Sequence, residues 1–287
     1  MTRGTYHLAR PAQRTTSVIF ASPHSGRDYP EAFLRRVALN PQEIRSSEDA
    51  FIDRLFMAAS AHGAPFLAAN APRAFVDLNR ASEELDPALI EGVRRSTHNP
   101  RIASGLGVIP RVVANGRAIY RGKMSLDEAQ DRIAGYWRPY HDMLQSLIDE
   151  SHTRFGEAIL IDCHSMPHEA LEQVSPPGQP RPDVVLGDRF GAAASASVVE
   201  RIEAAFASVG LRVARNMPFA GAYVTQHYGR PSRRQHAVQI EIDRALYMNE
   251  RTIEPSANFD AFRRLLAGVI AELSDIGRPG EVQVAAE

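Results

Sequence analysis

Short apolar runs alternate with amphipathic segments along most of the chain. The apolar runs have the length of buried strands, whereas the amphipathic segments repeat apolar residues every three or four positions, as helices do. This alternation is typical of an α/β fold in which helices cover a mostly parallel sheet. We expect strands at residues 17–21, 65–69, 74–78, 158–161, 184–186, 211–214 and 237–242.

Four amphipathic segments predict helices. They are residues 49–62, 133–148, 190–208 and 259–274. Pro139 lies inside the second segment and lacks a backbone N–H, so we expect a kink or a break near Arg138. Asp188 precedes the third segment as a possible cap. Residues 175–182, which are rich in proline, predict a loop, and residues 277–287 predict a loose tail.

Composition and charge narrow the class of protein. With 287 residues and 44% hydrophobic content, the chain can bury a sizeable core, and we treat residues 1–287 as one catalytic domain. A formal net charge of −1 gives no reason to expect nucleic acid or an anionic membrane as a partner. Cys163 is the single cysteine, and no apolar run has the length of a secretory signal or a membrane span. We therefore expect a cytoplasmic protein.

Polar side chains that could bind a metal follow two of the predicted strands. His24 follows residues 18–22, and His164 follows residues 158–161, so both imidazoles are expected at the carboxyl edge of the sheet. Two histidines and one carboxylate form a common catalytic zinc set, for which Asp49 or Glu48 could supply the carboxylate. Asp162 could orient His164, because residues two apart on a strand share a face. The alternative is that both histidines are hydrogen-bonded structural residues.

Charged residues at two other places suggest substrate binding and proton transfer. Arg80, in the segment DLNR, could grip a carboxylate, or it could form an ion pair with Glu83 or Glu84. Glu241 lies in the apolar segment VQIEID, where it could be a general base or the partner of Arg244 in a buried salt bridge.

Other apparent motifs carry no chemistry. The segment HEALE lacks the second histidine of a helical zinc motif, and Pro167 places its His168 at the start of a new segment. Cys163 should face away from His164 and fill the core, because neighbours on a strand point to opposite faces. The sequence contains no nucleophile elbow, Walker A motif or dinucleotide-binding glycine motif.

Taken together, these segments resemble the N-formylglutamate amidohydrolase family and, more distantly, the zinc carboxypeptidase and aspartoacylase group. The resemblance extends from about Ile19 to Glu250. The segments that carry it, in the family's order, are ASPHSGRDYP, SEDAFIDRLF, RAFVDLNR, GRAIYRG, LIDCHSMP, DVVLGDRFG, PFAGAYVTQHYGRP and VQIEIDRALYMNE. The resemblance implies a three-layer αβα fold with a mixed, mostly parallel sheet, as in zinc exopeptidases, and one Zn²⁺ ion.

The resemblance also assigns roles to individual residues. Its implied metal ligands are His24, Asp49 and His164. The carboxypeptidase group has an acidic ligand three residues after the first histidine, but this chain has Arg27 there, so the acidic ligand moves to Asp49, with Glu48 as the alternative. The remaining implied roles are water activation by Glu241, carbonyl polarisation by Arg73 and substrate binding by Asn79, Arg80, Arg111, Tyr223 and Arg230.

The implied reaction is hydrolysis of N-formyl-L-glutamate, a small anionic N-acyl amino acid, to formate and glutamate. Three alternatives remain open from the sequence. They are a hydrolase of another N-acyl amino acid or small peptide, a metal-free binding or regulatory protein on the same scaffold, and a structural interaction protein. Co, Mn or Fe could replace zinc in a site of this type.

Overall fold

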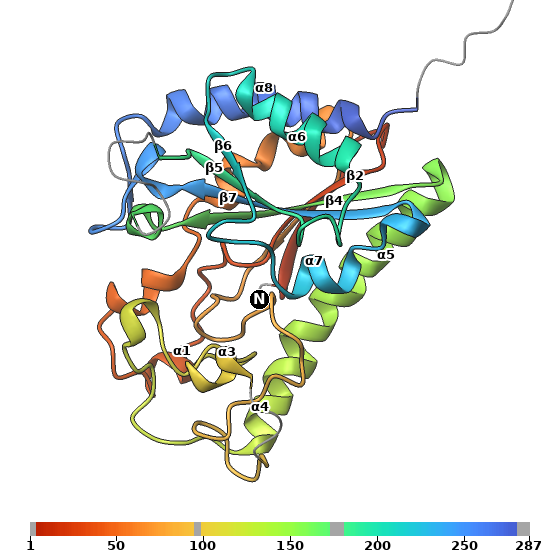
Figure 1. The fold of residues 1–287 in the computed structure, drawn as a ribbon. Coiled ribbons are helices and arrows are strands. Elements are labelled where there is room, and N and C mark those ends of the chain that lie inside the picture. The colour runs from red at the N-terminus through yellow and green to blue at the C-terminus, as the bar shows by residue number, and fades with distance from the viewer. Residues whose placement is uncertain (1–3, 95–98, 173–180, 280–287) are drawn as a thin grey trace, which may run out of the picture.

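A seven-stranded mixed sheet lies between two layers of helices in the computed structural model (Figure 1). The structure describes residues 4–94, 99–172 and 181–279. Most of the predicted loop at residues 175–182 and most of the predicted tail at residues 277–287 lie outside these ranges. No helix in the described part of the chain is long and apolar enough to cross a membrane.

The strands run in the order β1-β3-β2-β4-β7-β5-β6 across the sheet. Their bounds are β1 Tyr6–Ala9, β2 Val18–Ser22, β3 Phe66–Ala69, β4 Ala158–Met166, β5 Val184–Gly187, β6 Val213–Arg215 and β7 Gln235–Asp243. Four of the six neighbouring pairs are parallel, while β1 with β3 and β5 with β7 are antiparallel. A second, two-stranded sheet pairs β8 Met248–Asn249 with β9 Glu254–Pro255. The expected three-layer αβα fold with a mixed, mostly parallel sheet is confirmed.

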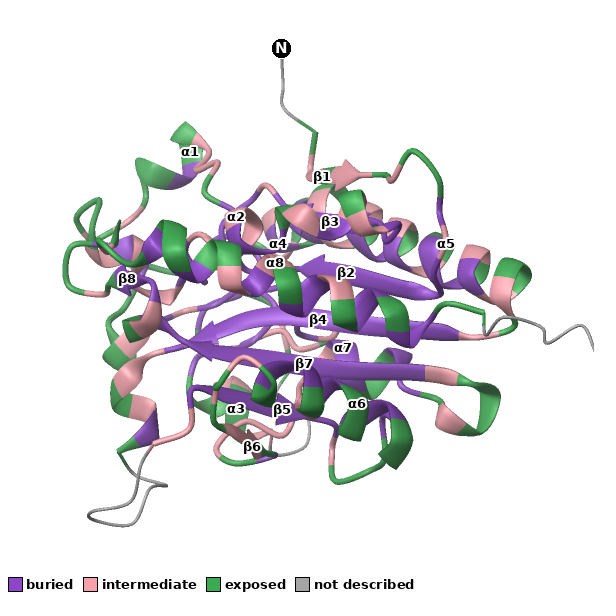
Figure 2. Cartoon of the chain, turned by 90° about the horizontal axis from the view of Figure 1, so that it is seen from above, coloured by how far each residue is buried: buried purple, intermediate pink, exposed green. Residues whose placement is uncertain are grey.

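The helices divide into two layers because the central strands bury both faces. Their bounds are α1 Glu31–Leu34, α2 Ile52–Leu55, α3 Pro100–Ala103, α4 Leu126–Arg132, α5 Arg138–Phe155, α6 Ala196–Ala207, α7 Tyr223–Tyr228 and α8 Phe259–Ile276. Helices α6 and α8 cover one face of the sheet, and α5 and α7 lie on the other (Figure 1). Figure 2 shows β2 and β4 buried along their whole length. Such strands are continuous apolar runs, which explains why the sequence reveals them.

Two predicted helices are shorter or more broken than expected. The segment 49–62 contains α2 and then a 3₁₀ helix at Met57–His62, instead of one helix. The segment 190–208 becomes helical only at Ala196. Asp188 caps no helix; its Oδ2 accepts a hydrogen bond from the Gly191 N–H within a turn.

The expected irregularity next to Pro139 is present. A π-helical turn at Ile133–Trp137 separates α4 from α5, in which Pro139 is the second residue. Proline fits there, at the start of a helix, because its missing N–H would have no partner within the helix.

The predicted strand at residues 74–78 is wrong. This segment is a turn in which the N–H groups of Phe75 and Val76 both donate to Pro72 O. Its apolar side chains still pack into the core on the α5 side of the sheet. The apolar run therefore reflects burial, and no neighbouring strand pairs with it.

Candidate active site

The loops after β2 and β3 are held closely together at the carboxyl edge of the sheet. His24 lies two residues after β2, in a turn where the Ser22 hydroxyl donates to the Ser25 hydroxyl at 2.9 Å. A Cβ atom on Gly26 would lie 2.1 Å from Ala71 O, so only glycine fits at this approach. The backbone of the first loop thereby fixes where His24 points.

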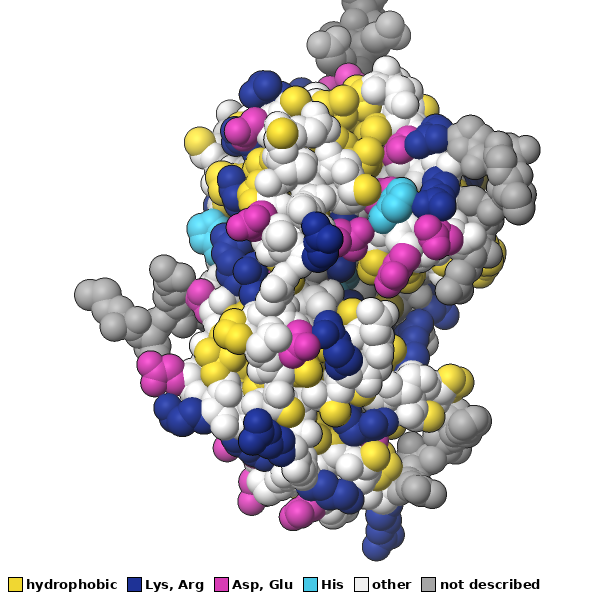
Figure 3. All heavy atoms as spheres, turned by 90° about the vertical axis from the view of Figure 1, so that its left-hand side faces the viewer, with side chains coloured by type: hydrophobic (Ala, Val, Ile, Leu, Met, Phe, Trp, Pro, Cys, Tyr) yellow, Lys and Arg dark blue, Asp and Glu magenta, His cyan; other side chains and the backbone are white. Residues whose placement is uncertain are grey.

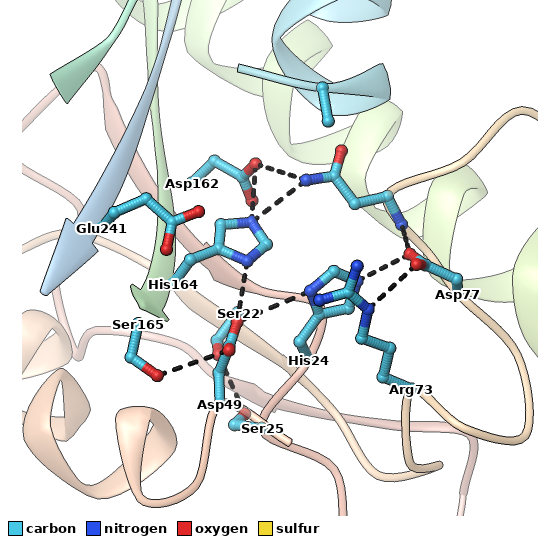
Figure 4. A network of polar contacts seen from close by, with 12 residues as sticks. Ser22, His24, Ser25, Asp49, Arg73, Asp77, Asp162, His164, Ser165 and Glu241 are labelled. Carbon is cyan, nitrogen blue, oxygen red and sulfur yellow. Dashed lines mark hydrogen bonds and ion pairs between the residues drawn. The ribbon is translucent and has the colours of Figure 1, made fainter. Parts of the chain in front are cut away.

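His24, Asp49 and His164 form a buried cluster with potential metal-ligand atoms within 4.8 Å of one another (Figure 4). Asp49 Oδ2 lies 2.9 Å from His164 Nδ1 and 3.5 Å from His24 Nδ1. Each of the three residues is 2% exposed. His164 lies inside β4, which is five residues longer than predicted, and both histidines reach the same edge as expected.

A carboxylate lies behind each imidazole. His24 Nε2 lies 2.7 Å from Asp77 Oδ1, and His164 Nε2 lies 3.0 Å from Asp162 Oδ2. The expectation that Asp162 lies on the same face of the strand as His164 is met. Both rings therefore direct Nδ1 toward Asp49, an arrangement in which outer carboxylates set the tautomer and direction of metal-binding histidines.

Asp49 is held from the side opposite the histidines. Its Oδ1 accepts hydrogen bonds from Arg244 at 3.1 Å and from the Ser165 hydroxyl at 3.3 Å. Although burial alone would raise the pKa of Asp49, the hydrogen bond from His164 and the nearby imidazole of His24 hold that pKa well below its ordinary value. Asp49 is thus an ionised carboxylate with Oδ2 directed at both imidazoles.

Glu48 points elsewhere. It accepts hydrogen bonds from the Tyr29 hydroxyl at 2.5 Å and from Arg45 at 3.0 Å. The geometry favours Asp49 over Glu48 as the acidic member of the cluster. Arg27, which occupies the position of an acidic ligand in the carboxypeptidase group, forms an ion pair with Asp53 at 3.1 Å.

Glu241 lies beside the cluster on the neighbouring strand. In the parallel pair of β4 and β7, His164 is opposite Glu241 and Asp162 is opposite Gln239. Gln239 donates to Glu241 Oε1 at 2.7 Å. Burial raises the pKa of Glu241 to about 7, so this carboxyl can gain or lose a proton near neutral pH. Arg244 pairs with Asp49 and not with Glu241, so the considered salt bridge is not formed.

A cleft of about 610 Å³ opens at this place, and its lining includes His24, Asp49, His164, Gln239 and Glu241. Arg73 and Arg80 also line it. Arg73 Nε donates to Asp77 Oδ2 at 3.0 Å. Arg80 donates to the backbone oxygens of Leu106 and Asn79, and forms no ion pair with any described glutamate. Figure 3 views the molecule from the side at which β4 and β7 end and shows basic and acidic side chains interspersed.

Asn79, in the connection after β3, contacts side chains of β4 and β7. Its Nδ2 lies 3.2 Å from His164 Nε2 and 3.3 Å from Gln239 Oε1, while its Oδ1 accepts from the Val224 N–H at 2.8 Å. These contacts use both ends of the amide. Because His164 Nε2 is directed at Asp162, Asn79 positions His164 through its hydrogen bond to Asp162 Oδ2, at 3.4 Å, and positions Gln239 directly.

Three predicted substrate-binding residues lie outside this cleft. Arg111 forms an ion pair with Asp86 at 2.8 Å. Tyr223 and Arg230 line a second cavity of about 610 Å³, whose lining shares Arg101 with the cleft. Arg230 donates to two backbone oxygens of the α7 region. The structure thus brings together the predicted metal-binding residues, Glu241, Arg73, Asn79 and Arg80, but not these three.

Several members of the site were not assigned a role from the sequence. Asp77, Gln239 and Ser165 contact the cluster or Glu241 directly. Asp77 is part of DLNR and Gln239 is two residues before Glu241, so strand alternation could have indicated Gln239.

Cys163 is not part of the site. It packs in the core on the α8 side of the sheet, as predicted.

The donor set fits a divalent cation. Two imidazole nitrogens and one carboxylate oxygen are the ligand types of catalytic zinc sites. His24 Nδ1 is buried and has no hydrogen-bond partner in the described structure, although it faces Asp49. A buried polar atom without a partner is costly, and a cation at this point would satisfy it.

Comparisons with known proteins identify the family of this chain. A model of the family described as N-formylglutamate amidohydrolase matches residues 16–248. The chain belongs to the N-formylglutamate amidohydrolase family. The resemblance expected from the sequence is confirmed, and the protein is accordingly a hydrolase of amide bonds.

Relatives in this family are similar over most of their length. The N-formylglutamate deformylase of Pseudomonas aeruginosa is 32% identical over 242 residues, which cover 82% of this chain and 83% of the relative. The crystal structure of N-formylglutamate amidohydrolase from Ralstonia eutropha JMP134 is 33% identical, with a TM-score of 0.89 over 96% of this chain and 99% of that one. A gene product of Agrobacterium tumefaciens shares the fold at 16% identity, with a TM-score of 0.66 and 96% of each chain covered.

Proposed function

We propose that this protein hydrolyses N-formyl-L-glutamate to formate and glutamate. The observation that carries the proposal is the buried cluster of His24, Asp49 and His164 with Glu241 beside it. The family supports an amide bond as the target, and relatives named N-formylglutamate deformylase support the formyl group and glutamate. The basic residues Arg73 and Arg80 in the same cleft suit an anionic substrate.

We assign one Zn²⁺ ion to the cluster, held by His24 Nδ1, His164 Nδ1 and Asp49 Oδ2. A bound zinc ion would supply Lewis acidity, which polarises a carbonyl oxygen and makes water more acidic. The negative charges of Asp49, Asp77 and Asp162 around the two imidazoles favour such a cation. Asp77 and Asp162 hold the rings in the tautomer that leaves Nδ1 free to bind it.

Glu241 is the proton carrier in this proposal. Its carboxylate takes a proton from water as the water oxygen bonds to the formyl carbon. When the carbon–nitrogen bond breaks, the same proton passes to the leaving nitrogen and frees the amino group of glutamate, while the second proton of the water is lost as formic acid ionises to formate. The hydrogen bond from Gln239 restricts the orientation of the Glu241 carboxylate throughout.

Two arginines would orient and polarise the substrate. Arg73 has its Nε bound to Asp77, and we assign its terminal nitrogens to the developing negative charge on the formyl oxygen. Arg80 is 7% exposed and is held by two backbone carbonyls, and we assign it to a substrate carboxylate. Holding the carboxylate would place the formyl group next to Glu241.

The test is metal content together with formate release from N-formyl-L-glutamate, for the wild type and for His164→Ala. We expect about one zinc per chain and formate release in the wild type, and neither in the variant. His7→Ala is the matched control, because His7 is exposed on β1 and belongs to no part of the cluster.

Two other results would change the assignment. Zinc binding without formate release would contradict the substrate, and formyl, acetyl and succinyl derivatives of glutamate and aspartate would then identify the acyl group that is cleaved. A wild type that binds no metal would contradict the catalytic proposal and favour a binding protein on the same scaffold.

A further inference from the structure

Four arginines line the cleft, and two of them form ion pairs with acidic residues in the described part of the chain. They are Arg73, Arg80, Arg101 and Arg244. Arg73 pairs with Asp77, and Arg244 pairs with Asp49. Neither Arg80 nor Arg101 has a carboxylate within ion-pair distance among the described residues. The cleft therefore presents two positive charges without an ion-pair partner among the described residues.

Arg80 is hydrogen-bonded to the stretch of chain that contains Arg101. Arg101 O accepts a hydrogen bond from the Leu106 N–H at 2.8 Å, and Leu106 O accepts one from Arg80 Nε at 2.9 Å. Residue 101 lies in the first turn of α3, where its N–H donates to the side chain of Asn99 at 2.9 Å. The Arg80 guanidinium and the backbone of Arg101 thus belong to one hydrogen-bonded wall of the cleft, and the exposed Arg101 side chain extends from it.

The two groups are close enough to influence each other. Burial lowers the pKa of Arg80, and the positive charges of Arg73 and Arg101 lower it further against the attraction of Asp77. Like charges gathered in a cleft repel one another, and a bound anion relieves that repulsion. An anion with two separate negative charges would relieve it most.

We propose that Arg101 binds the second carboxylate of a dicarboxylic N-acyl amino acid while Arg80 binds the first. The inference rests on the proposed function and extends it to substrate selection. An N-formylated acidic amino acid carries two carboxylates and no ammonium group, so its charge of two matches the two unpaired arginines. Arg101 would therefore discriminate an acidic side chain from its neutral amide.

Kinetic discrimination between N-formyl-L-glutamate and N-formyl-L-glutamine tests this role. Arg101→Met should reduce kcat/KM for N-formyl-L-glutamate at least about tenfold, mainly through KM, because a charge-assisted hydrogen bond is lost. The same variant should leave kcat/KM for N-formyl-L-glutamine unchanged. Arg101→Lys should restore part of the preference. Arg233→Met is the matched control, because Arg233 is exposed and lies outside the cleft.

Measurements of dicarboxylate binding test the role of Arg101 even if the protein does not catalyse the proposed reaction. Calorimetry with glutarate, a dicarboxylate, and butyrate, a monocarboxylate, requires no turnover. The wild type should bind glutarate at least about tenfold more tightly than butyrate, and Arg101→Met should remove the difference.

The outcomes separate the two proposals. A wild type that releases no formate but prefers glutarate through Arg101 would overturn the reaction and support the carboxylate site. An Arg101→Met variant with an unchanged preference, or with equal losses on both substrates, would overturn the role of Arg101 and leave the reaction intact. Equal binding of glutarate and butyrate by the wild type would also overturn that role.

Discussion

Asp77 Oδ1 lies 2.7 Å from His24 Nε2, while Asp77 Oδ2 accepts a hydrogen bond from Arg73 Nε at 3.0 Å. One carboxylate thus holds both a proposed metal ligand and a cation of the cleft. The pKa of Asp77 is well below its ordinary value, because the charges of Arg73 and His24 outweigh the effect of burial. Its charge is therefore available to both partners at neutral pH.

Replacing Asp77 should weaken metal binding without removing a ligand. Asp77→Asn removes the negative charge behind His24, and we expect about a 10- to 100-fold loss of zinc affinity. Competition with a chelator of known affinity measures the change. Asp86→Asn is the control, because it breaks another buried aspartate–arginine pair, with Arg111, away from the cluster. Equal zinc affinity in Asp77→Asn and the wild type would contradict an orienting role for Asp77.

Replacing Glu241 should separate turnover from metal binding. Glu241→Gln keeps the size of the side chain and removes its ability to accept a proton, so formate release should fall at least about 100-fold. Zinc content should stay at the wild-type level, since Glu241 is not one of the three proposed ligands. Metal analysis and a formate assay on the same sample make the comparison. Full activity in this variant would exclude Glu241 as the general base.

His141 should make the stability of the protein depend on pH. It lies between Tyr228 Oη and Leu78 O, each at 2.9 Å, and burial lowers its pKa from 6.5 to about 3. The unfolded chain binds a proton below pH 6.5 that the folded chain excludes. His141 should therefore lower the free energy of unfolding by about 1.4 kcal/mol per pH unit as pH falls from 6.5 toward 3.

Denaturant titrations across this pH range check the prediction. His141→Gln cannot take up the proton, so its free energy of unfolding should fall less steeply with decreasing pH. Both proteins contain the other titrating groups, and the difference between their slopes isolates His141. Parallel slopes for the two proteins would show that His141 keeps an ordinary pKa.

The central strands could be predicted because burial on both faces makes them continuous apolar runs. This explains the success with β2 and β3, and also the short prediction for β4, whose last residues include the polar Asp162 and His164. A continuous apolar run wrongly predicted a strand at residues 74–78, where apolar side chains are buried in a turn. Strand β1 was missed because it is a short edge strand with partly exposed residues.

The proposed metal-binding residues could be located because strand ends gather at one edge of the sheet. The contacts of Asp77 and Arg101 could not be predicted in this way. Both lie beyond the end of β3 in a long connection, where no periodicity shows which side chains turn inward. Arg111 and Arg230 were predicted to bind substrate, but both lie outside the cleft. Residue type alone cannot distinguish a substrate-binding arginine from one that stabilises a loop.

Strand β4 carries Asp162 and His164 between β2 and β7, at the centre of the sheet. The amide protons of such a strand exchange with solvent only when the whole sheet opens. The position of His164 should thus persist through fluctuations that disturb the loops carrying His24 and Asp49. Loss of the His164 side chain from the site would then coincide with global unfolding, whereas His24 and Asp49 could move away earlier.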